Sequence, residues 1–326
     1  MNVVLKTIAA AAALFASGAL AHAQDYPARQ VSIIVPFAAG GPTDTIARLY
    51  GEQLSKAFGQ PFIVENAAGA GGSTGTIRAS KAPADGYTFL VHNVAPHVAG
   101  PALYPSASYD PVGGFEPVAS LAEAAIYVVV RKDMPVKTLA EFVAYAKANP
   151  GKISYASAGA GSATHLACEL LKQRAGIDMV HIPYRGTGPA LNDLVSAKVD
   201  MMCDQGLNVG SQLKAGNVKA LAIAQEKRSA TFPDVPTAAE AGVANFIVNA
   251  STAIYAPKGT PTAVIEKVAK ALQEASKTEF LKMRLDQLVS DLPSGDRMSP
   301  AGLKAFTVSE STKWGEAIKS GGIKIN

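Results

Sequence analysis

An apolar segment passes directly into a glycine-rich loop and then into a helical pattern over residues 31–44, whose sequence is VSIIVPFAAGGPTD. The β-branched run at the start predicts a strand, and the apolar residues Ile46, Leu49 and Leu54 that follow predict a helix. The first turn of a helix has unpaired N–H groups and the positive end of the helix dipole, and glycines let a ligand approach the backbone. This stretch therefore predicts a site for a small anion.

A second loop of the same kind follows the predicted strand 153–155, with the sequence ASAGAGSATH over residues 156–165. It too runs into a helical pattern, marked by Leu166 and Leu170. Because the two loops are far apart in the chain, we expect two lobes that hold one small anion between them.

Strand and helix patterns alternate along almost the whole chain. Fully apolar strands in such an alternation predict a parallel sheet that is covered on both faces. The predicted strands are 32–35, 61–64, 87–91, 126–130, 153–155, 179–182, 199–202, 219–223 and 251–255, and the predicted helices are 43–58, 138–149, 164–174, 189–197, 261–276 and 300–320.

Two strands, 126–130 and 251–255, are expected to cross between the lobes. Lobe 1 then comprises residues 24–125 and 251–326, and lobe 2 comprises residues 126–250. Such a connection allows a hinge motion, since only a few backbone positions need to turn.

Residues 1–23 have the pattern of a secretory signal peptide, with Lys6, an apolar run too short to span a bilayer, and small residues around a cleavage site before Gln24. The formal net charge is only +4, and no run of Lys and Arg interleaved with aromatic residues occurs. We therefore expect an exported protein that does not bind nucleic acid, with a weak positive field that suits small anions.

No metal or cofactor is expected. The cysteines Cys168 and Cys203 form either a disulfide or two buried thiols, and no histidine pattern joins them into a metal site. The glycines of residues 69–75 lack the spacing of a dinucleotide fingerprint, and no phosphate-binding Gly-Lys-Ser/Thr sequence is present.

Four places could carry the chemistry. In the first loop, Thr43 and the backbone N–H groups are candidates to hold a carboxylate while Asp44 orients the loop, although both residues are also common helix caps. In the second loop, Ser162 is a cap or a ligand contact, and His165 lacks the nucleophile arrangement of a serine hydrolase. Tyr184 and Asp204 each lie near the end of a predicted strand, where ligands bind in open α/β sheets.

The motifs occur in a characteristic order along the mature chain. They are residues 26–27, 35–44, 64–66, 69–72, 85–88, 149–152, 155–159, 181–186, 234–237 and 256–261. In this order they resemble the Bug-type substrate-binding proteins of tripartite tricarboxylate transporters. The resemblance implies a periplasmic binding protein of type II, in which two α/β lobes are joined by a two-segment hinge and the ligand cleft lies between them.

The resemblance also implies a set of ligand-binding residues, with Asn208 as a further position at the far end of the pocket. The set is Phe37, Ala38, Gly41, Thr43, Asp44, Asn93, Ala95, Ala158, Gly159, Ser162, Thr164, His165, Tyr184, Gly186, Asp204 and Gln205.

The function that we expect is that of a monomeric, non-enzymatic receptor. It captures a small carboxylate, which could be a dicarboxylate, an amino acid or an aromatic acid, by closure of the lobes, and delivers it to the membrane subunits of the transporter. The alternatives are an exported hydrolase or isomerase that uses His165 or Asp204, and a binding protein that feeds a sensor kinase.

Overall fold

The computed structural model describes residues 26–104, 106–321 and 323, so the expected signal peptide lies outside the described residues. The strands are β1 (Val31–Val35), β2 (Phe62–Asn66), β3 (Thr88–Asn93), β4 (Phe115–Arg131), β5 (Ser154–Ser157), β6 (Val180–Pro183), β7 (Met201–Gln205), β8 (Val218–Ile223) and β9 (Asn249–Pro257). The helices are α2 (Pro42–Phe58), α3 (Ser73–Ser80), α4 (Val94–Leu103), α5 (Leu139–Ala148), α6 (Ala163–Ala175), α7 (Thr187–Val195), α8 (Gly206–Lys214), α9 (Thr262–Ser276), α10 (Glu279–Gln287) and α11 (Pro300–Gly321), with a 3₁₀ turn at Ala70–Gly72.

The strands form one sheet in the order β2-β1-β3-β9-β4-β7-β5-β6, with β8 also paired to β4. Pairing is parallel at the two ends, where β1 pairs with β2 and β3, and β5 pairs with β6 and β7. In the centre, β4 and β9 pair antiparallel with their neighbours. The expectation of a parallel sheet is therefore wrong for the centre, because an apolar strand indicates burial on both faces and carries no information on direction.

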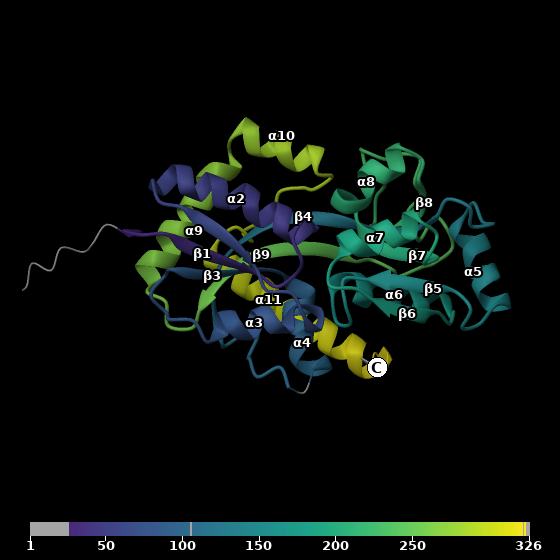
Figure 1. The fold of residues 1–326 in the computed structure, drawn as a ribbon, viewed down its shortest axis with the longest axis horizontal. Coiled ribbons are helices and arrows are strands. Elements are labelled where there is room, and N and C mark those ends of the chain that lie inside the picture. Colours follow the sequence, from purple (N-terminus) through teal and green to yellow (C-terminus); the bar gives the residue numbers. More distant parts are fainter. Residues whose placement is uncertain (1–25, 105, 322, 324–326) are drawn as a thin grey trace, which may run out of the picture.

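Strand β4 joins the two halves of the molecule. Its residues 115–125 pair with β9 in the first half, and its residues 126–131 pair with β7 and β8 in the second. Figure 1 shows these two halves side by side, with β4 and β9 running between them. Only the second part of β4 was predicted, because the first part is rich in Ala and contains Glu116 and Glu123 in place of β-branched residues.

Helices cover both faces of the sheet in each half. In the first half, α2 and α9 pack on one face and α4 and α11 on the other. In the second half, α6 covers one face while α7 and α8 cover the other. Helices α3, α4, α8 and α10 were not predicted; α4 contains Pro96, Gly100 and Pro101, and its burial stabilises it against this poor local propensity.

The cysteines Cys168 and Cys203 are both free and buried, so the structure contains two thiols here and no disulfide. Burial raises the pKa of the Cys168 thiol well above its usual value.

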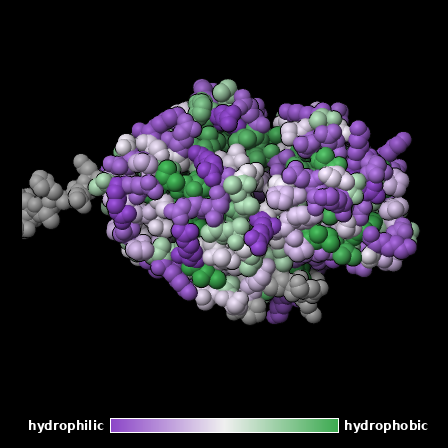
Figure 2. Space-filling view, viewed as in Figure 1, coloured by the Kyte–Doolittle hydropathy of each residue, from purple (hydrophilic) through white to green (hydrophobic). Residues whose placement is uncertain are grey.

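On the face shown in Figure 2, hydrophilic side chains dominate and hydrophobic ones appear in small groups. In the part of the chain that the structure describes, no helix is both long and apolar enough to span a bilayer.

Candidate functional site

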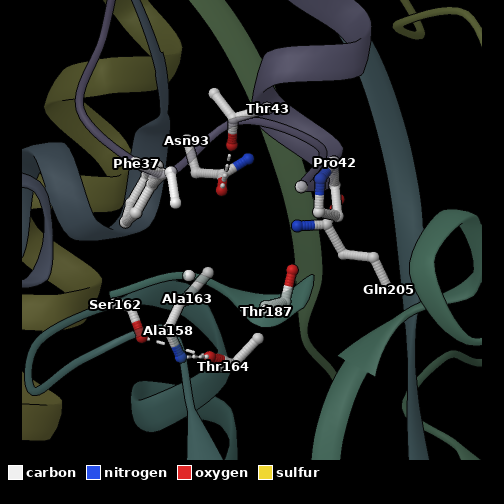
Figure 3. A pocket seen from close by; sticks show the side chains of 13 residues that line it. Phe37, Pro42, Thr43, Asn93, Ala158, Ser162, Ala163, Thr164, Thr187 and Gln205 are labelled. Atoms are coloured by element: carbon white, nitrogen blue, oxygen red, sulfur yellow. Dashed lines mark hydrogen bonds between the residues drawn. The ribbon is translucent and has the colours of Figure 1, made fainter. Parts of the chain in front are cut away.

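Five helices begin at one pocket between the two halves of the molecule. They are α2, α4, α6, α7 and α8, and their N-cap residues are Gly41, Asn93, Ser162, Gly186 and Gln205. All five caps line the pocket, whose space between protein atoms is about 330 Å³, including solvent at its opening. The other lining residues are Phe37, Ala38, Pro42, Thr43, Ala158, Ala163, Thr164 and Thr187 (Figure 3).

The pocket favours anions without any charged side chain in its lining. None of its lining residues carries a charge. Four of the five helices have no side-chain hydrogen bond at the cap, and only Ser162 accepts one, from the His165 N–H. Each helix start has roughly half a positive charge from the aligned peptide dipoles, together with unpaired N–H groups. The arrangement therefore favours a ligand with carboxylate groups.

A buried chain of polar side chains connects the pocket to the central sheet. Thr43 Oγ1 donates to Asn93 Oδ1 at 3.3 Å (Figure 3). Asn93 Nδ2 in turn donates to Thr252 Oγ1 on β9 at 3.0 Å. All three residues are buried. These bonds orient the starts of α2 and α4 relative to the strand that crosses between the halves.

Asp44 supports the first loop from behind and does not line the pocket. Its carboxylate accepts hydrogen bonds from the Gly40 N–H at 2.9 Å and from Asn66 Nδ2 at 2.9 Å, and it forms an ion pair with Arg48 at 2.9 Å. Burial opposes ionisation of this side chain, but the bonds from Arg48, Gly40 and Asn66 outweigh it and lower the pKa of Asp44.

Three neutral side chains accept hydrogen bonds from backbone N–H groups of the second loop. Thr164 Oγ1 accepts from the Ala158 N–H at 2.9 Å, Ser157 Oγ accepts from the Gly159 N–H at 3.1 Å, and His165 Nδ1 accepts from the Gly161 N–H at 3.0 Å. Burial, aided by Lys172, lowers the pKa of His165 to about 4. The imidazole is therefore neutral at pH 7, and its Nδ1 lone pair is used within the loop.

One arrangement in the second half resembles a catalytic pair. Ser157 Oγ lies 2.6 Å from His181 Nε2, as in enzymes that activate a serine. Ser157, however, is fully buried and its oxygen already accepts the Gly159 N–H. This hydroxyl has no path to a substrate, so the pair stabilises the loop.

Asp204 is fully buried beside the pocket and also does not line it. Its oxygens accept hydrogen bonds from the Gln205 N–H at 2.7 Å and from Asn208 Nδ2 at 2.5 Å. Burial raises the pKa of Asp204 to about 7, although these two bonds act in the opposite direction.

Ten of the sixteen residues that the sequence predicted as ligand contacts line this pocket. They are Phe37, Ala38, Gly41, Thr43, Asn93, Ala158, Ser162, Thr164, Gly186 and Gln205. The other six lie outside its lining: Asp44, Ala95, Gly159, His165, Tyr184 and Asp204. A ligand contact by these six remains a prediction.

Each of these six residues is engaged by, or packed against, another part of the structure. Asp44, His165 and Asp204 use their polar atoms on nearby backbone N–H groups. Ala95 is packed in the core within α4. Gly159 and Tyr184 line a separate hollow beside the pocket, where the Tyr184 hydroxyl donates to Asp193 Oδ2 at 2.7 Å.

Three lining residues were not among those predicted, namely Pro42, Ala163 and Thr187. Pro42 and Ala163 lie within the two loops that the sequence marked as anion sites, and Thr187 lies outside both. Thr187 is the first residue of α7, so a systematic search for polar residues at predicted helix starts would have identified it.

The two halves meet around the pocket. Tyr104 in the first half donates its hydroxyl to Ala160 O in the second at 2.7 Å, and the Ala38 N–H donates to Arg185 O at 3.3 Å. Gly71 is so close to the second loop that a Cβ atom there would lie 1.9 Å from Ala160 O. The two halves are therefore in direct contact around the pocket.

Among the described residues, no group of three or more His, Cys, Asp or Glu side chains is placed to hold a metal ion. Comparison with known proteins finds relatives over almost the whole chain. A relative from Agrobacterium vitis is 38% identical over 304 residues, which is 93% of this chain and 88% of the relative. The protein BugT from Bordetella pertussis is 34% identical, over 93% of this chain and 92% of its own length.

Solved structures show the same fold. The periplasmic binding protein BugD matches with a TM-score of 0.87 and 38% identity, over 92% of this chain and 99% of that chain. MatC from Rhodopseudomonas palustris, solved with bound malate, matches with a TM-score of 0.87 and 39% identity, over 90% of this chain and 100% of that chain. The family model described as "Tripartite tricarboxylate transporter family receptor" matches residues 46–323. This chain therefore belongs to the tripartite tricarboxylate transporter receptors, a family of periplasmic solute-binding receptors and not of enzymes.

Proposed function

We propose that this protein captures a small carboxylate in the periplasm and passes it to the membrane subunits of a tripartite tricarboxylate transporter. The observation that carries the proposal is the convergence of five helix starts on a pocket whose lining has no charged side chain. An anion is the ligand that such oriented N–H groups stabilise. The malate bound in MatC is consistent with this chemistry.

Closure of two lobes is the proposed mechanism. Lobe 1 comprises residues 24–125 and 251–326 and supplies the starts of α2 and α4, whereas lobe 2 comprises residues 126–250 and supplies those of α6, α7 and α8. The full set of donors is assembled only when the lobes meet, so a carboxylate binds the closed state more tightly than the open one. The crossings in β4 and β9 are the hinge. The protein acts as a monomer.

Ligand capture is tested by thermal unfolding of the mature chain, from Gln24, against small carboxylic acids and their amide analogues. A ligand that binds only the folded state raises the midpoint, so we expect a rise with acids that is lost with the amides. Equal shifts with acids and amides would contradict an anion receptor. Delivery is tested by uptake of the labelled acid in cells with and without the membrane subunits.

The closure mechanism has its own test in two glycine variants. Gly71 has φ +59° and lies against Ala160 of the other lobe, whereas Gly59 has φ +66° and no neighbouring atom within 4 Å of an added Cβ. The two substitutions Gly71→Ala and Gly59→Ala impose similar backbone strain, but only the first obstructs the contact between lobes. We expect Gly71→Ala alone to weaken ligand binding, by at least about tenfold. Equal affinities in the two variants would exclude closure at this contact.

A further inference from the structure

The hydroxyl group of Thr187 is a buried polar group without a partner. Thr187 is 5% exposed, and within the described part of the chain its Oγ1 atom has no hydrogen bond. Figure 3 shows this oxygen pointing from the start of α7 into the pocket. Buried hydroxyls are usually hydrogen-bonded because an unmade bond destabilises the fold, so a partner supplied by the ligand would explain this one.

Its surroundings form a second set of donors within the pocket. Thr187 follows Gly186, the N-cap of α7, and Gln205 is the N-cap of α8. Neither cap makes a side-chain hydrogen bond to its helix. In Figure 3 the Gln205 amide reaches into the same side of the pocket, away from Ser162 and Ala158. The first loop lies opposite, since a Cβ atom on Gly41 would be 3.4 Å from Thr187 Oγ1.

The charges around the pocket restrict the group that this place could hold. The two nearby carboxyl groups are already engaged, Asp44 by Arg48, Gly40 and Asn66, and Asp204 by Gln205 and Asn208. A ligand ammonium group would therefore meet helix starts and no free carboxylate, which disfavours it. A second carboxylate would meet hydroxyl, amide and N–H donors.

We propose that Thr187 is a specificity-determining residue whose hydroxyl donates a hydrogen bond to a second carboxylate of the ligand, beside the starts of α7 and α8. The pocket then binds dicarboxylic acids more tightly than monocarboxylic acids of the same length, and more tightly than their amino-substituted analogues. This inference rests on the proposed function, because it assigns the second end of the same ligand.

The test compares succinate, butyrate and aspartate on the wild-type protein and on two variants, by calorimetric titration. Thr187→Val keeps the shape of the side chain and removes the hydroxyl, whereas Thr187→Ser keeps the hydroxyl. We expect Thr187→Val to weaken succinate binding by about tenfold, as for one lost hydrogen bond to a charged group, and to leave butyrate unaffected. Thr187→Ser should bind succinate within about threefold of the wild type. The same titrations with glutarate and valerate, and with adipate and hexanoate, cover longer ligands.

Several outcomes would overturn the proposal. The proposal fails if Thr187→Val binds every dicarboxylate as tightly as the wild type does. It also fails if this variant loses equal affinity for a dicarboxylic acid and the monocarboxylic acid of the same length, or if the wild type binds aspartate more tightly than succinate. Circular dichroism and the thermal midpoint confirm that each variant is folded. If the wild-type protein bound none of these acids while a wider panel found no other anion, the proposed function itself would fail. Binding of the acids without a role for Thr187 would overturn this inference alone.

Discussion

A buried aspartate lies beside the pocket in each half of the molecule, and the two differ in their charge. Asp44 belongs to the first half and Asp204 to the second, and both are less than 4% exposed. Asp44 is paired with Arg48 and accepts two further hydrogen bonds, and its pKa is lowered. Among the described residues, Asp204 has two neutral donors and no cationic partner, and its pKa is raised to about 7.

The difference shows that burial does not decide whether a carboxyl group is charged. Desolvation raises the pKa of both aspartates, and the hydrogen bonds to Asp44, with Arg48 first among them, reverse the direction for Asp44. Asp44 is therefore ionised throughout the range from pH 5 to pH 8. Asp204 changes its charge in that range, next to the Gln205 N–H at the start of α8.

The largest expected effect concerns Asp44. Substitution Asp44→Ala removes the buried carboxylate that accepts from Gly40 and Asn66 and pairs with Arg48, and we expect the free energy of unfolding at pH 7 to fall by about 3 kcal/mol. Urea denaturation measures this. The matched control is Glu52→Ala on the same helix, where Glu52 pairs with Lys56 at the surface and the expected loss is below about 0.5 kcal/mol. Equal losses in the two variants would contradict the role given to Asp44.

A smaller effect is expected from the pH dependence of Asp204. Because its pKa is raised on folding, this group stabilises the fold fully below its unfolded value, and the stabilisation is lost as the pH rises through about 7. Between pH 5 and pH 8 the wild-type protein should lose about 2–3 kcal/mol of unfolding free energy relative to Asp204→Asn. Chemical denaturation of both proteins at each pH isolates this contribution, since the other titrating groups are shared. Parallel stability profiles would show that Asp204 does not titrate in this way.

The neutral support of the second loop predicts an effect without pH dependence. Substitution Thr164→Val removes the acceptor of the buried Ala158 N–H, and we expect a loss of about 1–2 kcal/mol in the free energy of unfolding. The loss should be the same at pH 5 and pH 8, in contrast to the Asp204 variant. Thr164→Ser restores the acceptor and should restore stability. A loss that varied with pH would mean that a titrating group supports this loop.

The smallest expected effect comes from removing a hydrogen bond between the two halves. Substitution Tyr104→Phe removes the hydrogen bond to Ala160 O, and we expect ligand binding to weaken by about threefold to tenfold because only the closed state has this bond. The comparison variant is Tyr184→Phe, which removes a bond to Asp193 within one half. Titration calorimetry should find its affinity unchanged. A loss of affinity in Tyr184→Phe would instead support the ligand contact that the sequence predicted for this tyrosine.

The sequence predicted the elements around the pocket better than the direction of their side chains. The strand and loop at residues 31–44 could be predicted because β-branched residues, glycines and a helix period are local signals. The resemblance implied that Asp44 and Asp204 contact the ligand, whereas the residues alone also predicted that Asp44 orients the first loop, in agreement with its bond to the Gly40 N–H. Their partners Asn66 and Asn208 then turn them away, and no pattern around the aspartates specifies that contact.

By itself, the sequence determined the alternation of strands and helices, the glycine loops at the helix starts and the membership of a receptor family, because these depend on short-range propensity and on motif order. The tertiary structure decided which helix starts meet, which polar atoms remain free for a ligand and which aspartate is ionised. Those properties depend on desolvation and on donors from distant parts of the chain, such as the Asn93 amide on Thr252, and these exist only after the halves have packed together.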